Sequence, residues 1–309
     1  MTEKKPHIEN MKLSAYGSTA IIAALNAGET LLPDFGKGAI SHKTGVSNVV
    51  TAGDLKSDEV IKNIILDRFP RHTIYSEESK NEITNPLLLD HCWIVDPLDG
   101  SKNYADGLDE IYVSIAYVRN GQLMVGVCYN PLKQQLFFAE KGKGAFYRGL
   151  PLKVEKPGQF VYEKLAVSQT QALAGASVET SIAYNPNQTI QHQLIKLALY
   201  KLGHTARFRE IGSSVGQLCR VARGQSDLHF HADLKPWDLA AGKLLIEEAG
   251  GVMTGMHGEE ITVMSPHSVA GNPDLVRQFV SVVNRLETDS VFRESLIKDI
   301  TNHIQDFKI

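Results

Sequence analysis

Residues 92–104 read C-W-I-V-D-P-L-D-G-S-K-N-Y, and the rest of the chain is best interpreted outward from this stretch. Its apolar start predicts a buried strand, which Pro97 ends because proline fixes its own φ and cannot donate to a strand ladder. Within six residues the chain then supplies the carboxylates of Asp96 and Asp99, a glycine at position 100 and the hydroxyl of Ser101. Glycine allows a second backbone or a ligand to come close at this point.

Two carboxylates three residues apart at the edge of a sheet repel each other unless a positive charge lies between them. At an effective dielectric constant of about 20, two unit charges about 4 Å apart cost roughly 4 kcal/mol. A hard divalent cation with oxygen ligands removes this cost, and Mg²⁺ is the usual case. We therefore expect Asp96 and Asp99 to share a cation, to which other segments bring further ligands and a substrate.

The composition excludes several classes of protein. With 309 residues, 43% hydrophobic and 22% charged, the chain can form one large domain or two ordinary ones with an ample core. A net charge of -3 does not indicate binding to nucleic acid or to an anionic membrane. The three cysteines, Cys92, Cys128 and Cys219, are odd in number and lack the spacing of a disulfide framework. This argues against disulfides and favours a reducing compartment. The polar N-terminus has no apolar signal region, and no run of about 18 apolar residues occurs, so we expect a cytoplasmic protein.

The hydrophobic pattern predicts a fold that mixes helices and strands. Two strand-like stretches, 111–118 and 123–129, are joined by R-N-G-Q, which predicts a hairpin turn. Apolar residues at helical spacing predict helices at 11–35, 57–69, 188–202, 236–249 and 273–283. Other strands are expected at 72–79, 135–139, 165–168 and 227–231. Hairpins in the middle and no regular βαβ repeat favour a layered α/β or α+β architecture.

A polar stretch at 153–163, which contains Pro157-Gly158, predicts a seam between two halves. We expect an N-terminal α+β half at 1–157 with most of the metal ligands. A C-terminal α/β half at 158–285 would carry the substrate loop and the last metal aspartate, and both halves would form one catalytic unit. The tail at 286–309 has apolar residues at helical spacing, which predicts a packing helix or, alternatively, a homodimer contact.

Acidic residues stand at four predicted strand or helix ends, at Asp54, at Glu77, at the pair Asp96 and Asp99, and at Asp238. Taken singly, each has an ordinary explanation as a solvated cap or an ion-pair partner. Asp238 lies near the start of a predicted helix, where the dipole favours a negative charge. The unit Asp-Pro-x-Asp-Gly-Ser after a buried strand is compact and unusual, and it favours a shared metal site.

The chain resembles a known family through three motifs in the same order. These are S-E-E-S at 76–79, W-I-V-D-P-L-D-G-S at 93–101, and W-D-x-A-A-G at 237–242 followed by E-A-G-G at 248–251. The family is the inositol monophosphatase superfamily of Mg²⁺-dependent, lithium-sensitive phosphatases, and three motifs in register are a specific signal. The resemblance extends over about residues 15–280. It implies a layered αβαβα sandwich of the sugar-phosphatase type.

The resemblance implies a metal site with two ions and a weaker third. Glu77, Asp96 and the backbone carbonyl of Leu98 would hold the first Mg²⁺. Asp96, Asp99 and Asp238 would hold the second. The third ion would lie near Glu77, where Asn48 stands in place of an aspartate that many relatives have.

The resemblance also implies catalytic and phosphate-binding roles. Ser101 matches the family's hydroxyl and Asp54 its orienting carboxylate, and together with Glu77 they would position and help deprotonate the attacking water. The amides of Gly100 and Ser101 would hold phosphate at a helix N-terminus, which the helix dipole also favours. The positions on the phosphate and substrate side are Lys43, Arg209, Gly212, Ser213 and His231.

The implied reaction is the hydrolysis of a phosphate monoester. The slowest such reactions need accelerations of up to about 10²¹. Paired metals activate water, neutralise the phosphoryl oxygens and stabilise the leaving alkoxide, so that no covalent nucleophile is needed. A metal- or phosphate-binding protein without activity is the alternative. A calcium loop at 99–110 fails because Tyr104 occupies the glycine position, and a kinase reading fails because G-K-G-A-F is no Walker A sequence.

Two further departures from the family pattern, besides Asn48, bear on the site. Ser76 replaces the usual glycine before the two glutamates. His231 stands seven residues before the metal aspartate, where inositol monophosphatases place a glutamate that receives inositol hydroxyls. An imidazole cannot be the same anionic acceptor, so the motifs leave the substrate open among inositol phosphate, 3′(2′),5′-bisphosphate nucleotides, histidinol phosphate and fructose 1,6-bisphosphate. Trp93 and Trp237, beside two of the acidic sites, are expected to pack in the core.

Overall fold

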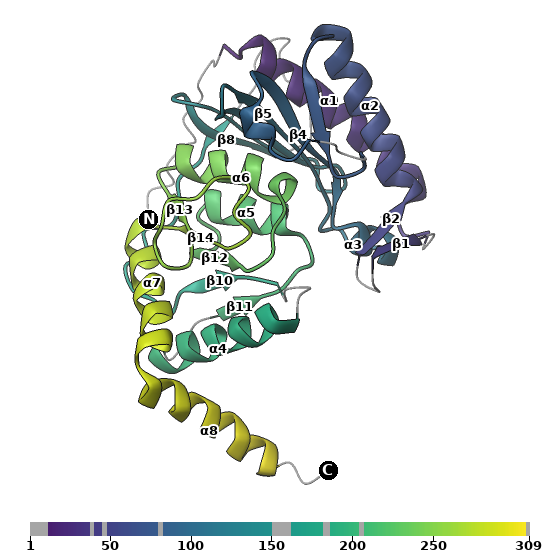
Figure 1. Cartoon of the computed structure of the whole chain (residues 1–309). Helices are drawn as coiled ribbons and strands as arrows, with labels where there is room; N and C mark the ends of the chain where they lie inside the picture. The colour runs from purple at the N-terminus through teal and green to yellow at the C-terminus, as the bar shows by residue number, and fades with distance from the viewer. Residues whose placement is uncertain are drawn as a thin grey trace, which may run out of the picture.

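The computed structural model describes residues 12–37, 40–44, 48–79, 83–149, 162–181, 186–203 and 207–306. These residues form five layers in the order helices, sheet, helices, sheet, helices (Figure 1). The predicted αβαβα sandwich is therefore confirmed. The two sheets have seven and five strands, and a separate two-stranded hairpin lies beside them.

The seven-stranded sheet is covered on one face by helices α1 (Ala15–Leu31) and α2 (Ala52–Arg68). Its strands follow the chain order from β3 to β9, and among them only β3 and β4 pair in parallel. Asn120 and Gly121 both have positive φ and form the predicted hairpin turn between β5 and β6. The strands are β3 (Thr73–Ser76), β4 (His91–Asp99), β5 (Tyr112–Arg119), β6 (Gln122–Asn130), β7 (Gln135–Glu140), β8 (Gly144–Gly149) and β9 (Glu163–Lys164).

Helix α1 shows why these elements form where they do. The helix begins after Ser14, whose side chain caps it by accepting from the amide of Gly17. It buries Ala20, Ala24 and Leu31, together with other small residues, against β5 and β6. The predicted range of 11–35 was too long at both ends, because the cap and the short 3₁₀ turn at Leu32–Asp34 bound the helix and spacing alone does not reveal them.

The second half contributes the inner helices, the five-stranded sheet and the outer helices. Helices α5 (Ser214–Ala222) and α6 (Pro236–Glu248) lie between the two sheets, and α6 packs on β4 to β8. Helices α4 (Pro186–Gly203) and α7 (Pro273–Thr288) cover the outer face of the five-stranded sheet, which has the order β11-β10-β12-β14-β13. Its strands are β10 (Ser177–Glu179), β11 (Arg207–Arg209), β12 (Leu228–His231), β13 (Val252–Thr254) and β14 (Ser268–Gly271).

Two short elements at the edge of the seven-stranded sheet frame the site described below. Strands β1 (Ile40–Thr44) and β2 (Asn48–Thr51) form an antiparallel hairpin that leads directly into α2. Helix α3 (Ser101–Asp106) follows β4 after the single residue Gly100. A 3₁₀ turn at Pro86–Leu88 precedes β4.

Residues 165–168, predicted as a strand, are not in one. Leu165 and Val167 are buried, but their amides bond to different partners, Leu165 to the carbonyl of Ala145 and Val167 to that of Ala249. No continuous ladder forms, because the segment crosses from one layer to another. The seam predicted at 153–163 lies almost wholly outside the described residues, and the division at 157/158 stays a prediction.

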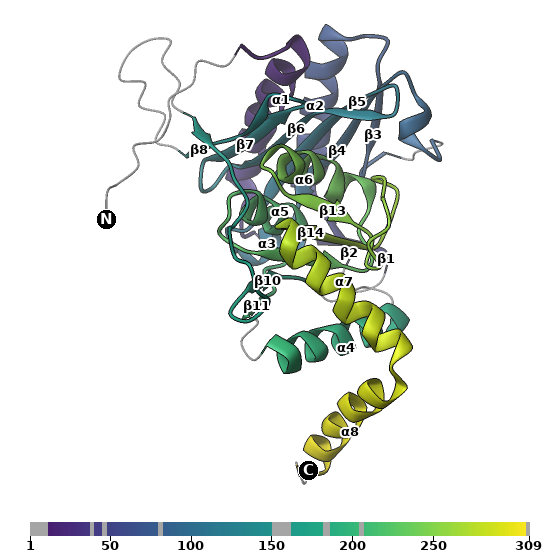
Figure 2. The same ribbon diagram turned by 90° about the vertical axis from the view of Figure 1, so that its left-hand side faces the viewer.

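The C-terminal tail is helical, but it does not form one helix over 286–307. Helix α7 continues to Thr288, and α8 (Ser290–Asp306) starts after Asp289, whose carboxylate accepts from the amide of Phe292 at 2.9 Å. This cap breaks the helix where apolar spacing alone predicts continuity. Figure 2 shows α8 pointing away from the five layers, although Leu296 is buried at its base.

Two further features are plain in the described part of the chain. None of its helices combines the length and the apolar character needed to cross a lipid bilayer. Cys92, Cys128 and Cys219 are free thiols in the core. Trp93 is fully buried and Trp237 is partly buried against the core, as predicted.

Candidate metal centre

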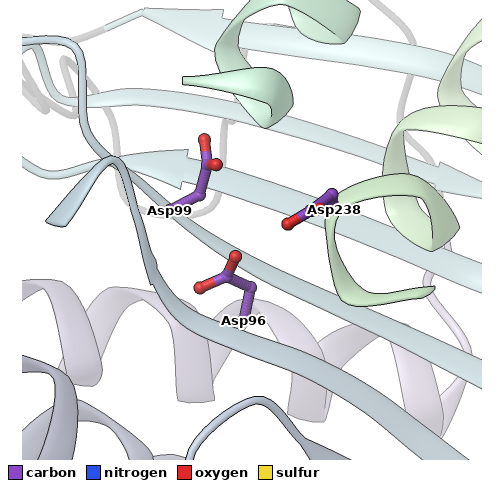
Figure 3. Close-up of side chains that lie close together, drawn as sticks. All are labelled: Asp96, Asp99 and Asp238. Carbon is purple, nitrogen blue, oxygen red and sulfur yellow. The ribbon is translucent and has the colours of Figure 1, made fainter. Parts of the chain in front are cut away.

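Three carboxylates meet where the first half and the second half of the chain come together. Asp96, Asp99 and Asp238 each offer one oxygen such that all three oxygens lie within 4.8 Å of one another (Figure 3). Asp96 and Asp99 come from the end of β4, and Asp238 comes from the first turn of α6. The sequence predicted this grouping from motifs that are about 140 residues apart in the chain.

The end of β4 is irregular, and this irregularity brings both of its aspartates to the cluster. In a regular strand, residues three apart point to opposite faces of the sheet. The pairing of β4 with β5 shifts register between Asp96 and Asp99, with Pro97 inside the shift. Oδ1 of Asp96 accepts a hydrogen bond from the amide of Leu98 at 3.0 Å, which fixes that carboxylate.

Asp238 is fixed by the start of its own helix. Pro236 occupies the first turn of α6, where its missing N–H costs nothing. Oδ2 of Asp238 accepts a hydrogen bond from the backbone amide of Lys235 at 2.8 Å. The other carboxylate oxygen is therefore available to face Asp96 and Asp99.

The cluster is electrostatically strained without a cation. Burial, and then the charges of Glu77 and Asp99, raise the pKa of Asp96 well above its usual value. Burial also raises the pKa of Asp238, again with help from Asp99 and Glu77. Burial raises the pKa of Asp99 to about 6, although a hydrogen bond from Ser213 acts in the opposite direction. Buried oxygen donors that destabilise one another's charge match the ligand set of a hard divalent cation.

Glu77 approaches the cluster from β3. Its amide donates to the carbonyl of Val95 on β4 at 3.1 Å, which extends the parallel pairing by one residue. This bond places Glu77 beside the end of β4, and the charge of Glu77 raises the pKa of both Asp96 and Asp238, although Glu77 is not one of the three residues within 4.8 Å.

Asp54 and Ser101 form a second polar group beside the metal ligands that the sequence predicts. Oγ of Ser101 lies 2.8 Å from Oδ1 of Asp54 and 3.0 Å from the carbonyl oxygen of Leu98. Oδ2 of Asp54 accepts from both the amide and the hydroxyl of Thr51, at 2.7 and 2.6 Å. Asp54 is only 1% exposed, so these contacts fix its orientation.

Thr51 was missed at the level of sequence, although a signal for it exists. The pattern T-x-x-D at 51–54 is a capping box, in which the two side chains satisfy each other's backbone amides at the start of α2. Strand β2 ends at Thr51, and Asp54 lies in the first turn of the helix that follows.

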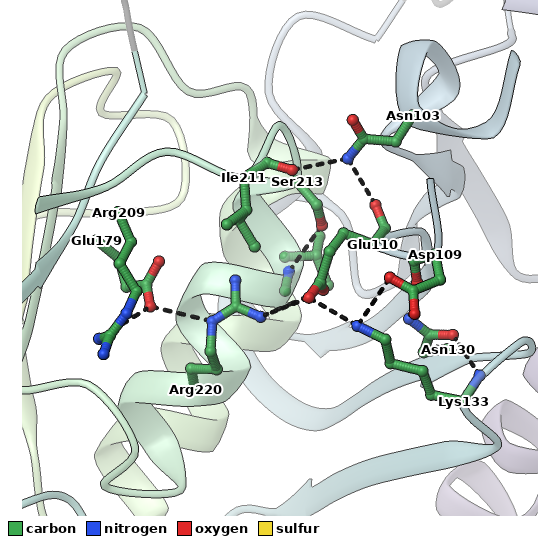
Figure 4. Close-up of polar contacts among 12 residues, drawn as sticks. Asn103, Asp109, Glu110, Asn130, Lys133, Glu179, Arg209, Ile211, Ser213 and Arg220 are labelled. Atoms are coloured by element: carbon green, nitrogen blue, oxygen red, sulfur yellow. Dashed lines mark hydrogen bonds and ion pairs between the residues drawn. The ribbon is translucent and has the colours of Figure 1, made fainter. Parts of the chain in front are cut away.

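Gly100 joins β4 to α3 in a conformation that favours glycine. Its φ is 88°, and a Cβ atom at this position would lie 2.7 Å from the carbonyl oxygen of Glu110. The loop is tied to the second half of the chain by Asn103, whose amide donates to the carbonyls of Glu110 and Ile211 at 2.9 and 2.7 Å (Figure 4). The start of α3 and the loop before α5 therefore lie side by side.

The N-terminus of α5 holds Asp99. The hydroxyl of Ser213 donates to Oδ2 of Asp99, and the amide of Val215 donates to the same oxygen at 3.1 Å. The hydroxyl of Ser213, which the family resemblance placed on the substrate side, thus faces a carboxylate of the cluster. Gly212 lies just before it, exposed, with φ of 70°.

Helix α5 is itself anchored by a chain of partly buried ion pairs, of which the pair between Arg220 and Glu110 joins the two halves (Figure 4). Nε of Arg220 lies 3.0 Å from Glu179, and Nη1 of Arg220 lies 3.2 Å from Glu110. Nζ of Lys133 lies 2.7 Å from the same Glu110. Glu179 is fully buried, so its charge depends on these partners. Sequence inspection missed this chain of ion pairs, because Arg220 is 41 and 110 residues away from its two partners.

For three of the residues predicted to contact substrate, Arg209, Lys43 and His231, the described part of the structure shows no contact with the carboxylate cluster. Arg209 donates to Ser226 at 3.1 Å and lies 4.0 Å from Glu179, at the far end of the ion-pair chain. Lys43 lies in β1, but its side chain is outside the described part of the structure. His231, at the end of β12, is buried, with 2% of its surface exposed.

The tautomer of His231 follows from its contacts. Nδ1 of His231 accepts a hydrogen bond from the amide of Asp233 at 3.0 Å, so the proton of the neutral ring is on Nε2. Burial, and then the nearby His192, lower the pKa of His231 to about 4. At neutral pH His231 is therefore an uncharged ring that offers an N–H donor at Nε2.

Comparison with known proteins identifies the family to which the chain belongs. The sequence profile described as "Inositol monophosphatase family" matches residues 13–291. The chain belongs to the inositol monophosphatase family. The family predicted from three short motifs is thereby confirmed over most of the chain.

Relatives with two kinds of name have similar identity. A protein named Nus factor SuhB from Pasteurella multocida is 32% identical over 272 residues, which is 87% of this chain and 96% of that protein. Inositol monophosphatase 3 of Solanum lycopersicum is also 32% identical over 278 residues, which is 89% of this chain and 99% of that protein. Membership of the family therefore indicates a protein of the inositol monophosphatase type, but it does not identify the substrate.

Solved structures agree with the fold. The crystal structure of the extragenic suppressor protein suhB from Bartonella henselae superposes with a TM-score of 0.76 at 28% identity and covers 87% of this chain and 98% of that one. An IMPase from Thermotoga maritima gives a TM-score of 0.74 at 29% identity, covering 87% and 96%.

Proposed function

We propose that this protein is a Mg²⁺-dependent phosphatase that hydrolyses a small phosphate monoester by direct attack of water. One observation carries the proposal. Two buried carboxylates at the end of β4 and the partly buried Asp238 of α6 approach within 4.8 Å of one another, beside a hydroxyl that is paired with the buried carboxylate of Asp54. Family membership supports the same reaction type.

Hard oxygen donors that raise one another's pKa are the surroundings that Mg²⁺ requires. Asp96, Asp99 and Asp238 would hold one ion. Glu77, Asp96 and the carbonyl of Leu98 would hold another, and a weaker third would lie near Glu77. When bound, Mg²⁺ supplies charge neutralisation for the phosphoryl and leaving oxygens and makes water a better nucleophile at neutral pH.

Asp54 and Ser101 would orient the attacking water and take its proton. Ser101 has a single hydroxyl proton, and the carboxylate of Asp54 at 2.8 Å is a stronger acceptor for it than the carbonyl of Leu98 at 3.0 Å. Donation to Asp54 leaves the lone pairs of Ser101 Oγ free to accept from water. As the water attacks, its proton passes to Ser101 Oγ while the serine proton passes to Oδ1 of Asp54. Glu77 would also help to position this water and take its proton.

The phosphate would lie on the backbone amides of Gly100 and Ser101, with Lys43 as a cation partner. Gly212, Ser213, Arg209 and His231 stay predicted residues of the substrate side. Ser213 would act there through Asp99, because its hydroxyl already donates to that carboxylate.

His231 supports a leaving group that presents an acceptor. Its neutral ring offers the Nε2 proton, whereas a glutamate in this position would receive hydroxyl protons. The substrates to compare are the four that the family motifs leave open, namely inositol phosphate, 3′(2′),5′-bisphosphate nucleotides, histidinol phosphate and fructose 1,6-bisphosphate. We also expect inhibition by Li⁺, a cytoplasmic location and a possible homodimer.

The alternative is a metal- or phosphate-binding protein without catalysis. Its support is that several relatives at about the same identity carry the name Nus factor SuhB and not the name of an enzyme. A single measurement distinguishes the two functions, namely whether the protein releases inorganic phosphate from a substrate.

The experiment is a phosphate-release screen over the four substrate classes with Mg²⁺, with EDTA and with added Li⁺. We expect Mg²⁺-dependent release from at least one class, and none from the Asp96→Asn variant. Release that is insensitive to EDTA, or full turnover by Asp96→Asn, would exclude the proposed mechanism. Tight Mg²⁺ binding with no release from any substrate would favour the non-enzymatic alternative.

A further inference from the structure

The turn that carries Glu77 is held by a set of contacts that the reaction itself does not explain. Residues 76–79 read S-E-E-S, and the first and last of these side chains both contact helix α2. Glu77 lies between them. The contacts involve Asp58 and Lys62, which lie one helical turn apart on α2.

Ser76 connects the turn to Asp58. Its hydroxyl donates to Oδ1 of Asp58 at 2.5 Å, and it accepts from the amide of Glu78 at 3.3 Å. Ser76 is 0% exposed and Asp58 is 6% exposed, so water does not compete for these bonds. The amide of Ser79 also donates to the carbonyl of Ser76 at 3.2 Å, which closes the turn.

Lys62 connects the other end of the turn to the same carboxylate. Its ammonium lies 2.5 Å from Oδ2 of Asp58 and donates to the hydroxyl of Ser79 at 2.7 Å. The two oxygens of Asp58 thus serve the two ends of the turn, Oδ1 directly and Oδ2 through Lys62. The ammonium neutralises Asp58, so this carboxylate adds little negative charge near Glu77.

A residue with a side-chain hydroxyl is needed at position 76. Glycine there would leave Oδ1 of Asp58 without its donor and the amide of Glu78 without its acceptor. The turn on which Glu77 lies would then lose its side-chain link to α2 at Ser76. The hydroxyl therefore restricts the turn in a way that glycine could not.

We propose that Ser76, Asp58 and Lys62 form a clamp that positions Glu77 and thereby sets the affinity of the Glu77 side of the metal site. The inference rests on the proposed function, since it assumes that Glu77 is a metal ligand. None of the three clamp residues is proposed to touch the metal or the substrate. They are positioning residues that act through Glu77. Groups that orient a metal ligand typically change metal affinity by about 10- to 100-fold.

The test is calorimetric titration of Mg²⁺ into the full-length, substrate-free protein. We expect Ser76→Ala and Ser76→Gly each to weaken one Mg²⁺ binding event by about 10-fold or more and to leave the other event unchanged. Asp238→Asn should weaken the other event. Lys62→Met should resemble Ser76→Ala, whereas Lys62→Arg, which keeps the charge, should restore most of the affinity.

A matched control separates positioning from general destabilisation. Glu247→Gln removes an exposed ion pair with Lys243, also one turn apart on a helix, at the end of α6 away from Asp238. It should leave both binding events unchanged. The melting temperatures of all variants in EDTA show whether each is folded, and Lys62→Met keeps the test valid if a substitution at Ser76 prevents folding.

The possible results are distinct. If wild type binds Mg²⁺ and the Ser76 and Lys62 variants bind it equally well, the clamp is refuted while the proposed function stands. If the variants weaken both events equally and in proportion to their loss of melting temperature, the role is structural and the clamp is refuted. If wild type binds no Mg²⁺, the proposed function fails and the clamp fails with it.

Discussion

Oγ of Ser101 lies 2.8 Å from Oδ1 of Asp54, although 47 residues separate the two in the sequence. Thr51 holds the other oxygen of Asp54 with two hydrogen bonds, so the carboxylate cannot turn away. The pair is therefore built to keep the serine hydroxyl in one orientation. This orientation is what general acid–base catalysis needs from a residue that relays a proton.

Removing the relay should lower turnover without removing the metal. We predict that Ser101→Ala and Asp54→Asn each lower kcat by about 10²- to 10⁴-fold, the usual contribution of a positioned acid or base. Neither residue is among the three that cluster within 4.8 Å, so Mg²⁺ binding by calorimetry should change far less than kcat. Steady-state kinetics at saturating Mg²⁺ measures the effect. A loss of less than about 5-fold in both variants would rule out the relay.

Neutralising one carboxylate of the cluster should abolish activity and stabilise the metal-free protein. Burial and neighbouring acids raise the pKa of Asp96, so its charge opposes folding when no cation is present. Asparagine keeps an oxygen that can accept from the amide of Leu98. We predict that Asp96→Asn melts about 2–4 °C higher than wild type in EDTA at pH 8, for roughly 1 kcal/mol gained.

The melting measurement has an internal control. In Mg²⁺ the order should reverse, because wild type gains stability from the bound ion and the variant does not. A variant that melts below wild type in EDTA would contradict the electrostatic account of the cluster.

The stabilisation by Mg²⁺ should depend on pH. In the metal-free protein the pKa values of Asp96, Asp99 and Asp238 lie above the unfolded value of 3.8. The stability that their protonated forms contribute is present below pH 3.8 and is lost as the pH rises through the folded values, about 6 for Asp99. Since Mg²⁺ needs deprotonated ligands, the rise in Tm on adding Mg²⁺ should be large at pH 8 and small at pH 5.

Buried histidines act in the opposite direction but cancel in this comparison. Burial lowers the pKa of His192 and His231 to about 4, from 6.5. The unfolded chain therefore takes up more protons between these values, and stability falls as the pH drops from 6.5 to 4. This loss affects the metal-free and Mg²⁺-loaded proteins alike. A difference in Tm that stays constant from pH 8 to pH 5 would refute the prediction for the carboxylates.

The ion-pair chain behind α5 should be important for stability. Arg220→Met would leave Glu179, which is fully buried, without its closest cation. Removing one partner of a buried pair typically costs about 3–5 kcal/mol, and we expect a loss in this range from urea unfolding. Arg220→Lys keeps the charge but cannot reach both Glu179 and Glu110 with a planar fork, so its loss should be intermediate.

An exposed pair provides the comparison for Arg220. Arg277 and Asp274 form an ion pair on the surface of α7, and Arg277→Met should change stability by less than about 0.5 kcal/mol. Equal effects of the substitutions at Arg220 and Arg277 would show that the buried chain does not anchor α5.

Local signals in the sequence were sufficient for the mixed helix and strand content, the central hairpin and the pair Asp96 and Asp99, whereas the five-layer order came from the resemblance to a family. The turn at Asn120-Gly121 needs two residues with positive φ, so it is visible without a structure. The prediction that Pro97 ends the strand was wrong, because β4 continues to Asp99 through a register shift that contains Pro97. Grouping Asp238 with Asp96 and Asp99 required the resemblance to a family, because no local rule joins residues so far apart.

The supporting contacts could not be predicted in this way. Ser213 reaches Asp99 across 114 residues, and Ser76 reaches Asp58 across 18, because packed elements bring them together. Helix ends were also uncertain where a cap decides them. The carboxylate of Asp289 starts a new helix at a point where apolar spacing continues without interruption.

The central claim is that Asp96, Asp99 and Asp238 converge on a bound divalent cation. Mn²⁺ has the same oxygen preference as Mg²⁺ and scatters anomalously, so crystals grown with Mn²⁺ locate the ion directly. The account predicts an anomalous peak between the three carboxylates, with a second peak on the side of Glu77, and loss of the first in Asp238→Asn. A well-ordered map with no peak among these carboxylates would contradict it.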